Sequence, residues 1–257
     1  MENKFSLDFF NLDGKVAIVT GGNTGLGMAY AEALAKAGAD LLVTTFDDNI
    51  KEVKEIVEGI GRKIVFVKGD LTKSECREEV ISTCLKEYSK IDILVNNAGT
   101  IRRAPLLEYK ESDWQAVMDI NLNAVYHLSQ KVAKLMVEQK SGKIINIASM
   151  LSFQGGKFVP PYTASKHGVA GLTKAFANEL AVHNVQINAI APGYIETANT
   201  APIRADENRN KEILSRIPCE RWGKVDDLMG TVVFLASKAS DYINGHILAV
   251  DGGWLVR

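Results

Sequence analysis

The sequence predicts a single doubly wound α/β domain, with a seven-stranded parallel sheet and helices on both faces. Two observations indicate this fold: short runs of β-branched residues alternate with longer amphipathic segments, and several of the runs are apolar throughout. Alternating strands and helices produce parallel sheets, and strands that are buried on both faces are apolar at every position. No linker-like stretch and no internal repeat divides the 257 residues, so we expect one domain over 1–257.

The elements follow from these runs in order. Strands are expected at 16–20, 41–45, 64–67, 91–95, 144–148, 185–191 and 246–250. Helices are expected at roughly 25–38, 49–60, 74–88, 111–138, 162–183 and 226–236. Gly38 follows the first helix as its expected C-cap. The pattern breaks at about 194–218, a segment that we expect to form a lid over the carboxyl ends of the strands, where such sheets bind ligands.

Composition restricts the possible function. Lys and Arg number 30 against 31 Asp and Glu, which gives a net charge of −1, and 46% of residues are hydrophobic. These values exclude a disordered chain and argue against a broad nucleic-acid or membrane surface. Cys76, Cys84 and Cys219 have no CxxC spacing, and the four histidines form no ligand cluster, so we expect no metal site and a reducing compartment. Without a signal-like or membrane-spanning segment, the expected location is the cytoplasm.

A glycine-rich sequence joins the first strand to the first helix. It reads Thr20-Gly21-Gly22-Asn23-Thr24-Gly25-Leu26-Gly27. Glycines permit a tight turn and close approach of the backbone to a ligand, and the helix N-terminus offers free N–H groups to a pyrophosphate. The sequence therefore predicts a dinucleotide site, with a glycine-rich turn that binds nothing as the alternative.

The end of the second strand bears on the choice of cofactor. Thr45 stands where dinucleotide folds commonly place an acid that binds the ribose, and Asp47 and Asp48 follow it. No Lys or Arg lies in 20–27 or 44–48, so a 2′-phosphate would meet only negative charge. NAD is therefore favoured over NADP, although the two acids could equally begin the next helix as solvated residues.

Candidate acid–base residues lie further along the chain. Tyr162 and Lys166 are four residues apart and share one helix face. A nearby ammonium stabilises tyrosinate and brings its pKa from about 10 toward neutrality. Ser149 ends the fifth strand and could bind a substrate oxygen in the same crevice.

Together these motifs resemble the short-chain dehydrogenase/reductase family, whose fold is the Rossmann type. Asn121 and Pro192-Gly193 extend the resemblance, which covers essentially the whole chain. It implies that Tyr162 is the general acid/base, that Lys166 lowers the pKa of Tyr162, that Ser149 polarises the substrate carbonyl and that Asn121 holds a water of a proton relay. The residues that it places around the cofactor are Gly21, Asn23, Thr24, Gly25, Leu26, Gly27, Asp70, Leu71, Asn97, Ala98, Gly99, Tyr162, Lys166, Ile195 and Thr197.

A narrower resemblance, carried by 144–156 and 249–254, is to the sugar-acid dehydrogenases of this family. Some of these act on deoxygluconates and others on gluconate at carbon 5, and the sequence has features of both. Arg102, Arg103, Gln154 and Arg204 are candidates for binding the carboxylate and hydroxyls of such a substrate, although each arginine could instead be solvated or paired with an acid. A non-catalytic NAD(H)-binding regulator and a carbonyl reductase remain alternatives.

An oligomer is also expected. The helices at 111–138 and 162–183 carry apolar residues on more than one face, and family members usually associate through these helices as homotetramers. The residues concerned include Val117, Leu122, Val125, Leu128, Val132 and Leu135. The alternative is that they pack on the sheet.

Overall fold

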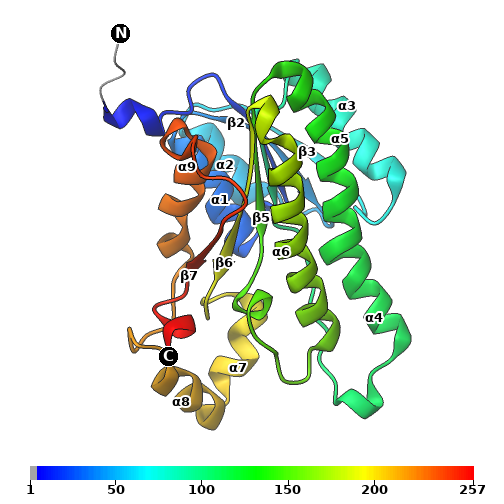
Figure 1. Ribbon diagram of the computed structural model, residues 1–257, viewed down its shortest axis with the longest axis vertical. Helices are drawn as coiled ribbons and strands as arrows, with labels where there is room; N and C mark the ends of the chain where they lie inside the picture. Colours follow the sequence, from blue (N-terminus) through cyan, green and yellow to red (C-terminus); the bar gives the residue numbers. More distant parts are fainter. Residues whose placement is uncertain (1–4) are drawn as a thin grey trace.

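The computed structural model describes residues 5–257 and contains one parallel sheet with the strand order β3-β2-β1-β4-β5-β6-β7 (Figure 1). The order reverses between β1 and β4, which makes that position the switch point where such sheets bind ligands. The strands are β1 (Val16–Thr20), β2 (Asp40–Thr45), β3 (Ile64–Lys68), β4 (Ile93–Asn96), β5 (Gly142–Ile147), β6 (Val185–Pro192) and β7 (Ile247–Val250). The predicted doubly wound fold and its seven strands are confirmed.

Helices cover both faces of the sheet (Figure 1). One face carries α1 (Gly25–Lys36), α2 (Lys51–Gly59) and α9 (Met229–Ala236); the other carries α3 (Ser74–Tyr88), α4 (Glu111–Met118), α5 (Ala124–Gln139) and α6 (Pro160–Leu180). Strand β1 explains this layering, because Ala17 and Val19 pack into the first core while Val16 and Ile18 pack into the second. All five β1 residues are buried.

One predicted helix differs from expectation. The segment expected as a single helix over 111–138 is α4, then a π-helical turn at Asp119–Asn123, then α5. A π turn inserts one extra residue per turn and often marks a functional site. Apolar periodicity continues through it, so the sequence pattern alone did not indicate it.

The apolar residues that favoured an oligomer are mostly buried inside the single chain. Val117, Val125, Leu128 and Val132 are all at most 7% exposed. Leu122 and Leu135 are half-buried and pack on buried clusters. These residues therefore pack on the sheet and its helices, and they no longer support association.

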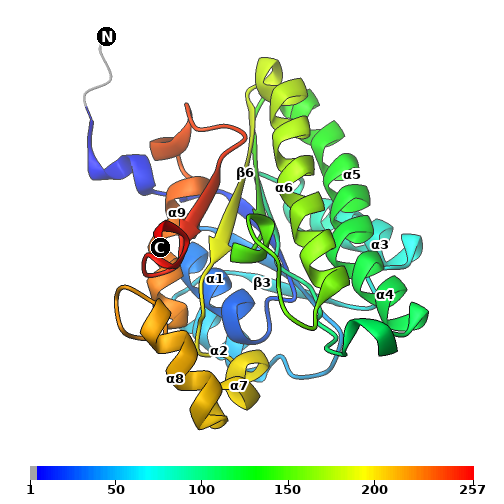
Figure 2. The same ribbon diagram turned by 60° about the horizontal axis from the view of Figure 1, so that its bottom comes forward.

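The segment expected as a lid folds into α7 (Ala201–Ala205) and α8 (Glu207–Arg216). Figure 2, in which the bottom of the molecule comes forward, shows both helices beyond the ends of the strands, with the C-terminal turn close to α8. Across 5–257, no helix combines the length and apolar character needed to cross a bilayer.

Candidate functional site

A cavity of about 1580 Å³ lies at the carboxyl ends of the strands. It runs from the glycine-rich loop after β1, past the loops that follow β2, β3 and β4, to Ser149 and Tyr162 and then to the lid. Loops from separate strands converge there because all strands of a parallel sheet end at the same edge. The cavity is large enough for a dinucleotide and a small substrate together.

The glycine-rich loop forms one wall of this cavity. Gly21 and Gly25 have positive φ angles of 60° and 53°, a backbone conformation that L side chains rarely adopt. A Cβ at residue 27 would collide with the carbonyl oxygen of Gly21, so the turn requires glycine there. Thr24 makes no side-chain cap on α1, which leaves the first N–H groups of the helix without a side-chain partner. Asn23, Thr24 and Leu26 line the same wall, and the arrangement fits a pyrophosphate.

The loop after β2 places a carboxylate at this end of the cavity. Asn23 Nδ2 donates to Asp47 Oδ1 at 2.9 Å, and Thr45 Oγ1 donates to the Asp47 carbonyl at 2.8 Å. Asp47 lines the cavity, whereas Asp48 does not and pairs with Lys68 at 2.7 Å. The sequence alone does not distinguish these two adjacent acids, but in the structure only Asp47 faces the cavity.

Asp70 and Leu71 lie beside this carboxylate, after β3. Both line the cavity. Asp70 Oδ1 accepts from Thr72 N at 2.9 Å, and Arg77 Nη1 donates to the Leu71 carbonyl at 2.6 Å. Arg77 is 7% exposed and thus fixes this loop from behind.

The loop after β4 is tied to the glycine-rich loop. Asn97 Nδ2 donates to the carbonyls of Thr20 and Gly21, at 2.9 and 3.1 Å. Ala98 and Gly99 line the cavity with Asn97. The Asn97 side chain, predicted to contact the cofactor, therefore holds two cavity loops in register.

Ser149, Tyr162 and Lys166 all line the cavity. Lys166 is 6% exposed; its Nζ donates to the Ile147 carbonyl at 2.5 Å and lies 5.5 Å from the centroid of the Tyr162 ring. Burial lowers the pKa of Lys166 to about 8. Burial raises the pKa of Tyr162, while the hydrogen bond with Ser149 and the charge of Arg103 lower it. The structure thus joins the three predicted catalytic side chains.

Asn121 lies behind this cluster, on the π turn. Its side chain is 1% exposed; Oδ1 accepts from Thr100 N at 2.8 Å and Nδ2 donates to Thr100 O at 2.9 Å. Asn121 is not on the cavity wall, although its neighbours Asp119 and Ile120 are. Its amide is therefore bonded to the backbone, and its role in a proton relay stays a prediction.

The segment predicted to form a lid lines the far end of the cavity. Tyr194, Ile195 and Thr197 line it just after β6. Tyr194 packs edge-on against Trp222 and Trp254, with ring centroids 5.3 and 4.7 Å apart. This aromatic cluster gives the end of the cavity a fixed wall.

The predicted substrate residues have different positions. Arg102, Arg103 and Gln154 line the cavity. Arg204 does not; its Nη2 lies 3.5 Å from the Thr197 carbonyl and its Nη1 lies 4.0 Å from Glu196.

Two further arginines of the lid, Arg209 and Arg216, line the cavity but were missed from the sequence. Their seven-residue spacing places both on one face of α8. That spacing was the signal that could have identified them.

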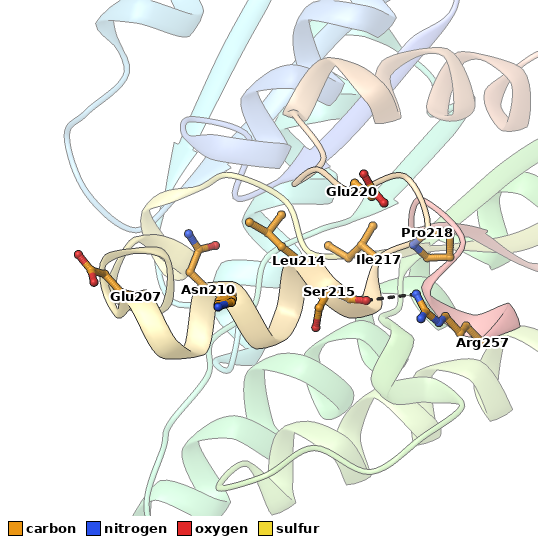
Figure 3. Close-up of a pocket in the computed structure, with 9 residues that line it drawn as sticks. Glu207, Asn210, Leu214, Ser215, Ile217, Pro218, Glu220 and Arg257 are labelled. Carbon is orange, nitrogen blue, oxygen red and sulfur yellow. Dashed lines mark hydrogen bonds between the residues drawn. The ribbon is translucent and has the colours of Figure 1, made fainter.

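A smaller cavity, of about 430 Å³, lies between α8 and the C-terminal residue (Figure 3). Arg257 donates there to the Ser215 carbonyl at 3.1 Å. Its lining includes no residue of the glycine-rich loop and none of Ser149, Tyr162 and Lys166, so it is separate from the candidate site. Within 5–257 no group of three or more His, Cys, Asp and Glu side chains is arranged to hold a metal ion.

Comparison with known proteins places this site among oxidoreductases. A family model described as enoyl-(acyl carrier protein) reductase matches residues 21–255. A 2-dehydro-3-deoxy-D-gluconate 5-dehydrogenase of Bacillus subtilis (strain 168) is 56% identical over 97% of this chain and 98% of that protein.

Solved structures are also similar. A protein of Agrobacterium tumefaciens with bound NADP, assigned as a 2-deoxy-D-gluconate 3-dehydrogenase, is 49% identical, with a TM-score of 0.87 over 96% of this chain and 99% of that one. A gluconate 5-dehydrogenase of Burkholderia cenocepacia J2315, in complex with NADP and tartrate, is 37% identical, with a TM-score of 0.94 over 98% of this chain and 100% of that one.

Proposed function

Because the chain belongs to the short-chain dehydrogenase/reductase family, we propose that it interconverts a secondary hydroxyl and a ketone on a sugar acid, using NAD. The specific activity proposed is that of a 2-dehydro-3-deoxy-D-gluconate 5-dehydrogenase, also described as a 2-deoxy-D-gluconate 3-dehydrogenase. The observation that carries this proposal is that Ser149, Tyr162 and Lys166 share one cavity with the glycine-rich loop and with cavity-facing arginines. The names of the relatives support the substrate class.

The side chains of this cavity have distinct roles in the proposed reaction. Tyr162 takes the proton of the substrate hydroxyl, and Ser149 hydrogen-bonds to the same oxygen and holds it in place. Lys166, cationic below its pKa of about 8, stabilises the tyrosinate and binds the nicotinamide ribose. A bound nicotinamide dinucleotide supplies the hydride acceptor for the carbon. In the reverse direction Tyr162 returns the proton to the carbonyl oxygen.

The choice of NAD rests on the adenosine end of the cavity. Asp47 lines the cavity there, just beyond Thr45, which occupies the usual position of the ribose-binding acid. From this place the Asp47 carboxylate would bind ribose hydroxyls and repel a 2′-phosphate. No Lys or Arg of the described chain lines that end. Two solved relatives contain NADP, so the decisive comparison is between NAD and NADP in this protein.

Steady-state kinetics with both cofactors tests this choice. We expect kcat/KM with NAD to exceed that with NADP by about tenfold or more, equivalent to ~1.4 kcal/mol, and Asp47→Ser to reduce the ratio. Asp48→Asn is the matched control, because Asp48 pairs with Lys68 outside the cavity. Equal or better use of NADP by the wild-type protein would refute the proposal for NAD.

The substrate is tested by following NADH absorbance with 2-dehydro-3-deoxy-D-gluconate, 2-deoxy-D-gluconate and D-gluconate. Identifying each product shows which carbon is oxidised. Preference for D-gluconate would support the alternative, a gluconate 5-dehydrogenase. Binding of NADH without turnover of any sugar acid or ketone would indicate a non-catalytic NAD(H)-binding regulator instead.

We further propose that the protein is a cytoplasmic homotetramer. The free state of Cys76, Cys84 and Cys219 supports a reducing compartment, and the family supports the tetramer. Light scattering after size-exclusion chromatography should give about four times the 28.1 kDa of one chain. Cell fractionation tests the compartment.

A further inference from the structure

Arg216 occupies an unusual position at the end of α8. Its guanidinium carbon lies 3.9 Å from the centroid of the Trp254 ring, and its Nη2 donates to Gln154 Oε1 at 3.1 Å. The three side chains come from the lid, the C-terminal turn and the loop after Ser149, and all three line the main cavity. Figures 1 and 2 both show the C-terminal turn close to α8.

The charges around this end of the cavity distinguish Arg216 from most of its neighbours. Arg102, Arg204 and Arg209 each have a carboxylate within 4.0 Å, from Asp113, Glu196 and Glu212 respectively. In the part of the chain that the structure describes, neither Arg103 nor Arg216 has one. An arginine without an acidic partner on a concave wall is available to bind an anion bidentately.

Arg103 and Arg216 occupy different positions relative to the reacting atoms. Arg103 follows β4, and its charge lowers the pKa of the Tyr162 hydroxyl, whereas Arg216 stacks on the Trp254 ring, which packs against Tyr194. Tyr194 and Trp254 belong to the aromatic wall at the lid end. Arg216 therefore stands on this aromatic wall, where a guanidinium can face the end of a substrate whose reacting carbon lies at Tyr162.

We propose that Arg216 binds the carboxylate of the substrate and so selects sugar acids over neutral sugars. This inference rests on the proposed sugar-acid substrate. Trp254 and Gln154 act through Arg216 as positioning residues: the ring supports the face of the guanidinium, and Gln154 fixes its edge. Because Arg216 belongs to α8, the bound carboxylate also ties the lid to the cavity.

The test compares Arg216→Gln with Arg216→Lys and with a matched control, Lys211→Gln. Lys211 lies on the same helix and lines only the smaller cavity, so its loss reproduces the change in net charge. Each protein is assayed with NAD and D-gluconate, with the better of the two deoxy acids, and with the methyl ester of the preferred acid. NADH binding and thermal unfolding show whether each variant is folded.

Arg216→Gln should raise KM for the acid about 10- to 100-fold, the usual range for a hydrogen-bonded ion pair. KM for NAD and turnover of the ester should change less than about threefold. For Arg216→Lys, the KM for the acid should lie between the wild-type value and that of Arg216→Gln, because lysine keeps the positive charge but cannot bind a carboxylate bidentately. An unchanged KM in Arg216→Gln, or equal losses with acid and ester, would overturn the proposal.

Equilibrium binding separates this inference from the proposed function. The binding of D-gluconate and of its methyl ester to the complex with NADH is measured by calorimetry. Tighter binding of the acid than of the ester that disappears in Arg216→Gln supports the carboxylate site even if the wild-type protein turns over no sugar acid. If Arg216→Gln turns over the sugar acid as well as the wild-type protein does, the proposed function stands, and the proposal that Arg216 binds the carboxylate is refuted.

Discussion

Opposing influences act on the Tyr162 hydroxyl. Its place within the cavity floor raises its pKa, while the hydrogen bond with Ser149 and the charge of Arg103 lower it. Lys166 is held on the Ile147 carbonyl, 5.5 Å from the ring centroid. The pKa of Tyr162 therefore depends on burial, on Ser149 and on Arg103 together.

Replacing the tyrosine tests its role as acid and base. Tyr162→Phe removes only the hydroxyl, so turnover should fall by at least about 10²- to 10⁴-fold, the contribution typical of a general acid–base group. NADH binding, measured by fluorescence titration, should change little. Tyr242→Phe, on a fully exposed side chain, is the control. Full activity in Tyr162→Phe would exclude the mechanism.

Arg103 is expected to set the pH at which oxidation begins. Its positive charge favours tyrosinate, so Arg103→Gln should move the rising limb of the oxidation profile to higher pH. Lys110→Gln provides the control, since Lys110 is exposed on the following turn and does not line the cavity. An unchanged limb, measured from kcat between pH 6 and about 10, would contradict this role of Arg103.

The buried position of Lys166 has a cost in stability. Burial lowers its pKa from 10.5 to about 8, so the folded protein carries an unfavourable buried charge below pH 8. The unfolded chain holds its proton up to higher pH, and the free energy of unfolding therefore rises between pH 8 and 10.5. Lys166→Met should lack this rise.

The same variant should lose catalysis and bind NAD more weakly. Lys174→Met, on an exposed position of the same helix, is the control for both measurements. Chemical denaturation at several pH values gives the stability difference, and titration gives the affinity. Unchanged NAD affinity in Lys166→Met would contradict the contact with the nicotinamide ribose.

Candidate catalytic residues could be predicted where their spacing in the sequence determines their relative positions in the fold. Tyr162 and Lys166 are four residues apart on one helix, and Ser149 closely follows the end of β5 at the shared edge of the sheet, so their meeting follows from the fold. Arg216 meets Gln154 and Trp254 only through the tertiary path of the lid. That path depends on packing between segments up to 100 residues apart, which local patterns do not encode.

At the scale of elements, the cofactor is proposed to bind on the unit formed by β1, the glycine-rich loop and α1. The loop has little room for change, because residue 27 faces the carbonyl of Gly21 and the amide of Asn97. The same amide donates to the carbonyls of Thr20 and Gly21. The shape of the loop is therefore set jointly by β1 and β4.

Gly27→Ala should disrupt this unit. The added methyl group collides with backbone atoms, which cannot move as a flexible side-chain end can, so the loop must shift. We expect NAD affinity to fall by about tenfold or more and stability to fall by ~1–3 kcal/mol, as for overpacked sites. Gly59→Ala is the control, because nothing lies within 4 Å of its Cβ position. Equal NAD affinity in the two variants would refute the proposed close approach.

Strands and helices with a regular spacing of apolar residues could be predicted from the sequence, whereas the π turn could not. The strands follow from apolar runs and are displaced by at most a few residues. The π turn at Asp119–Asn123 lies between two helices whose apolar residues continue the same spacing. The spacing of apolar residues in the sequence therefore does not reveal the turn. It became visible only from the backbone, where Asn121 turns its amide onto Thr100.

Across the whole molecule, one sheet supplies both parts of the site. The glycine-rich loop follows β1, the candidate catalytic serine follows β5, and the lid follows β6. Every neighbouring pair of strands is hydrogen-bonded within a single sheet. We therefore expect the residues proposed to bind the cofactor to unfold together with those proposed to bind the substrate.

This continuity predicts one cooperative unfolding transition for the chain. Saturating NADH should shift the entire transition, since a ligand at 100 times its Kd stabilises the native state by ~2.7 kcal/mol. In urea at fixed protein concentration, the near-ultraviolet and far-ultraviolet circular dichroism transitions should coincide with each other without NADH, and both should move together to higher urea when NADH is added. Two transitions, of which only one responds to NADH, would instead show that 1–257 is divided into separate folding units and that the lid and sheet are energetically independent.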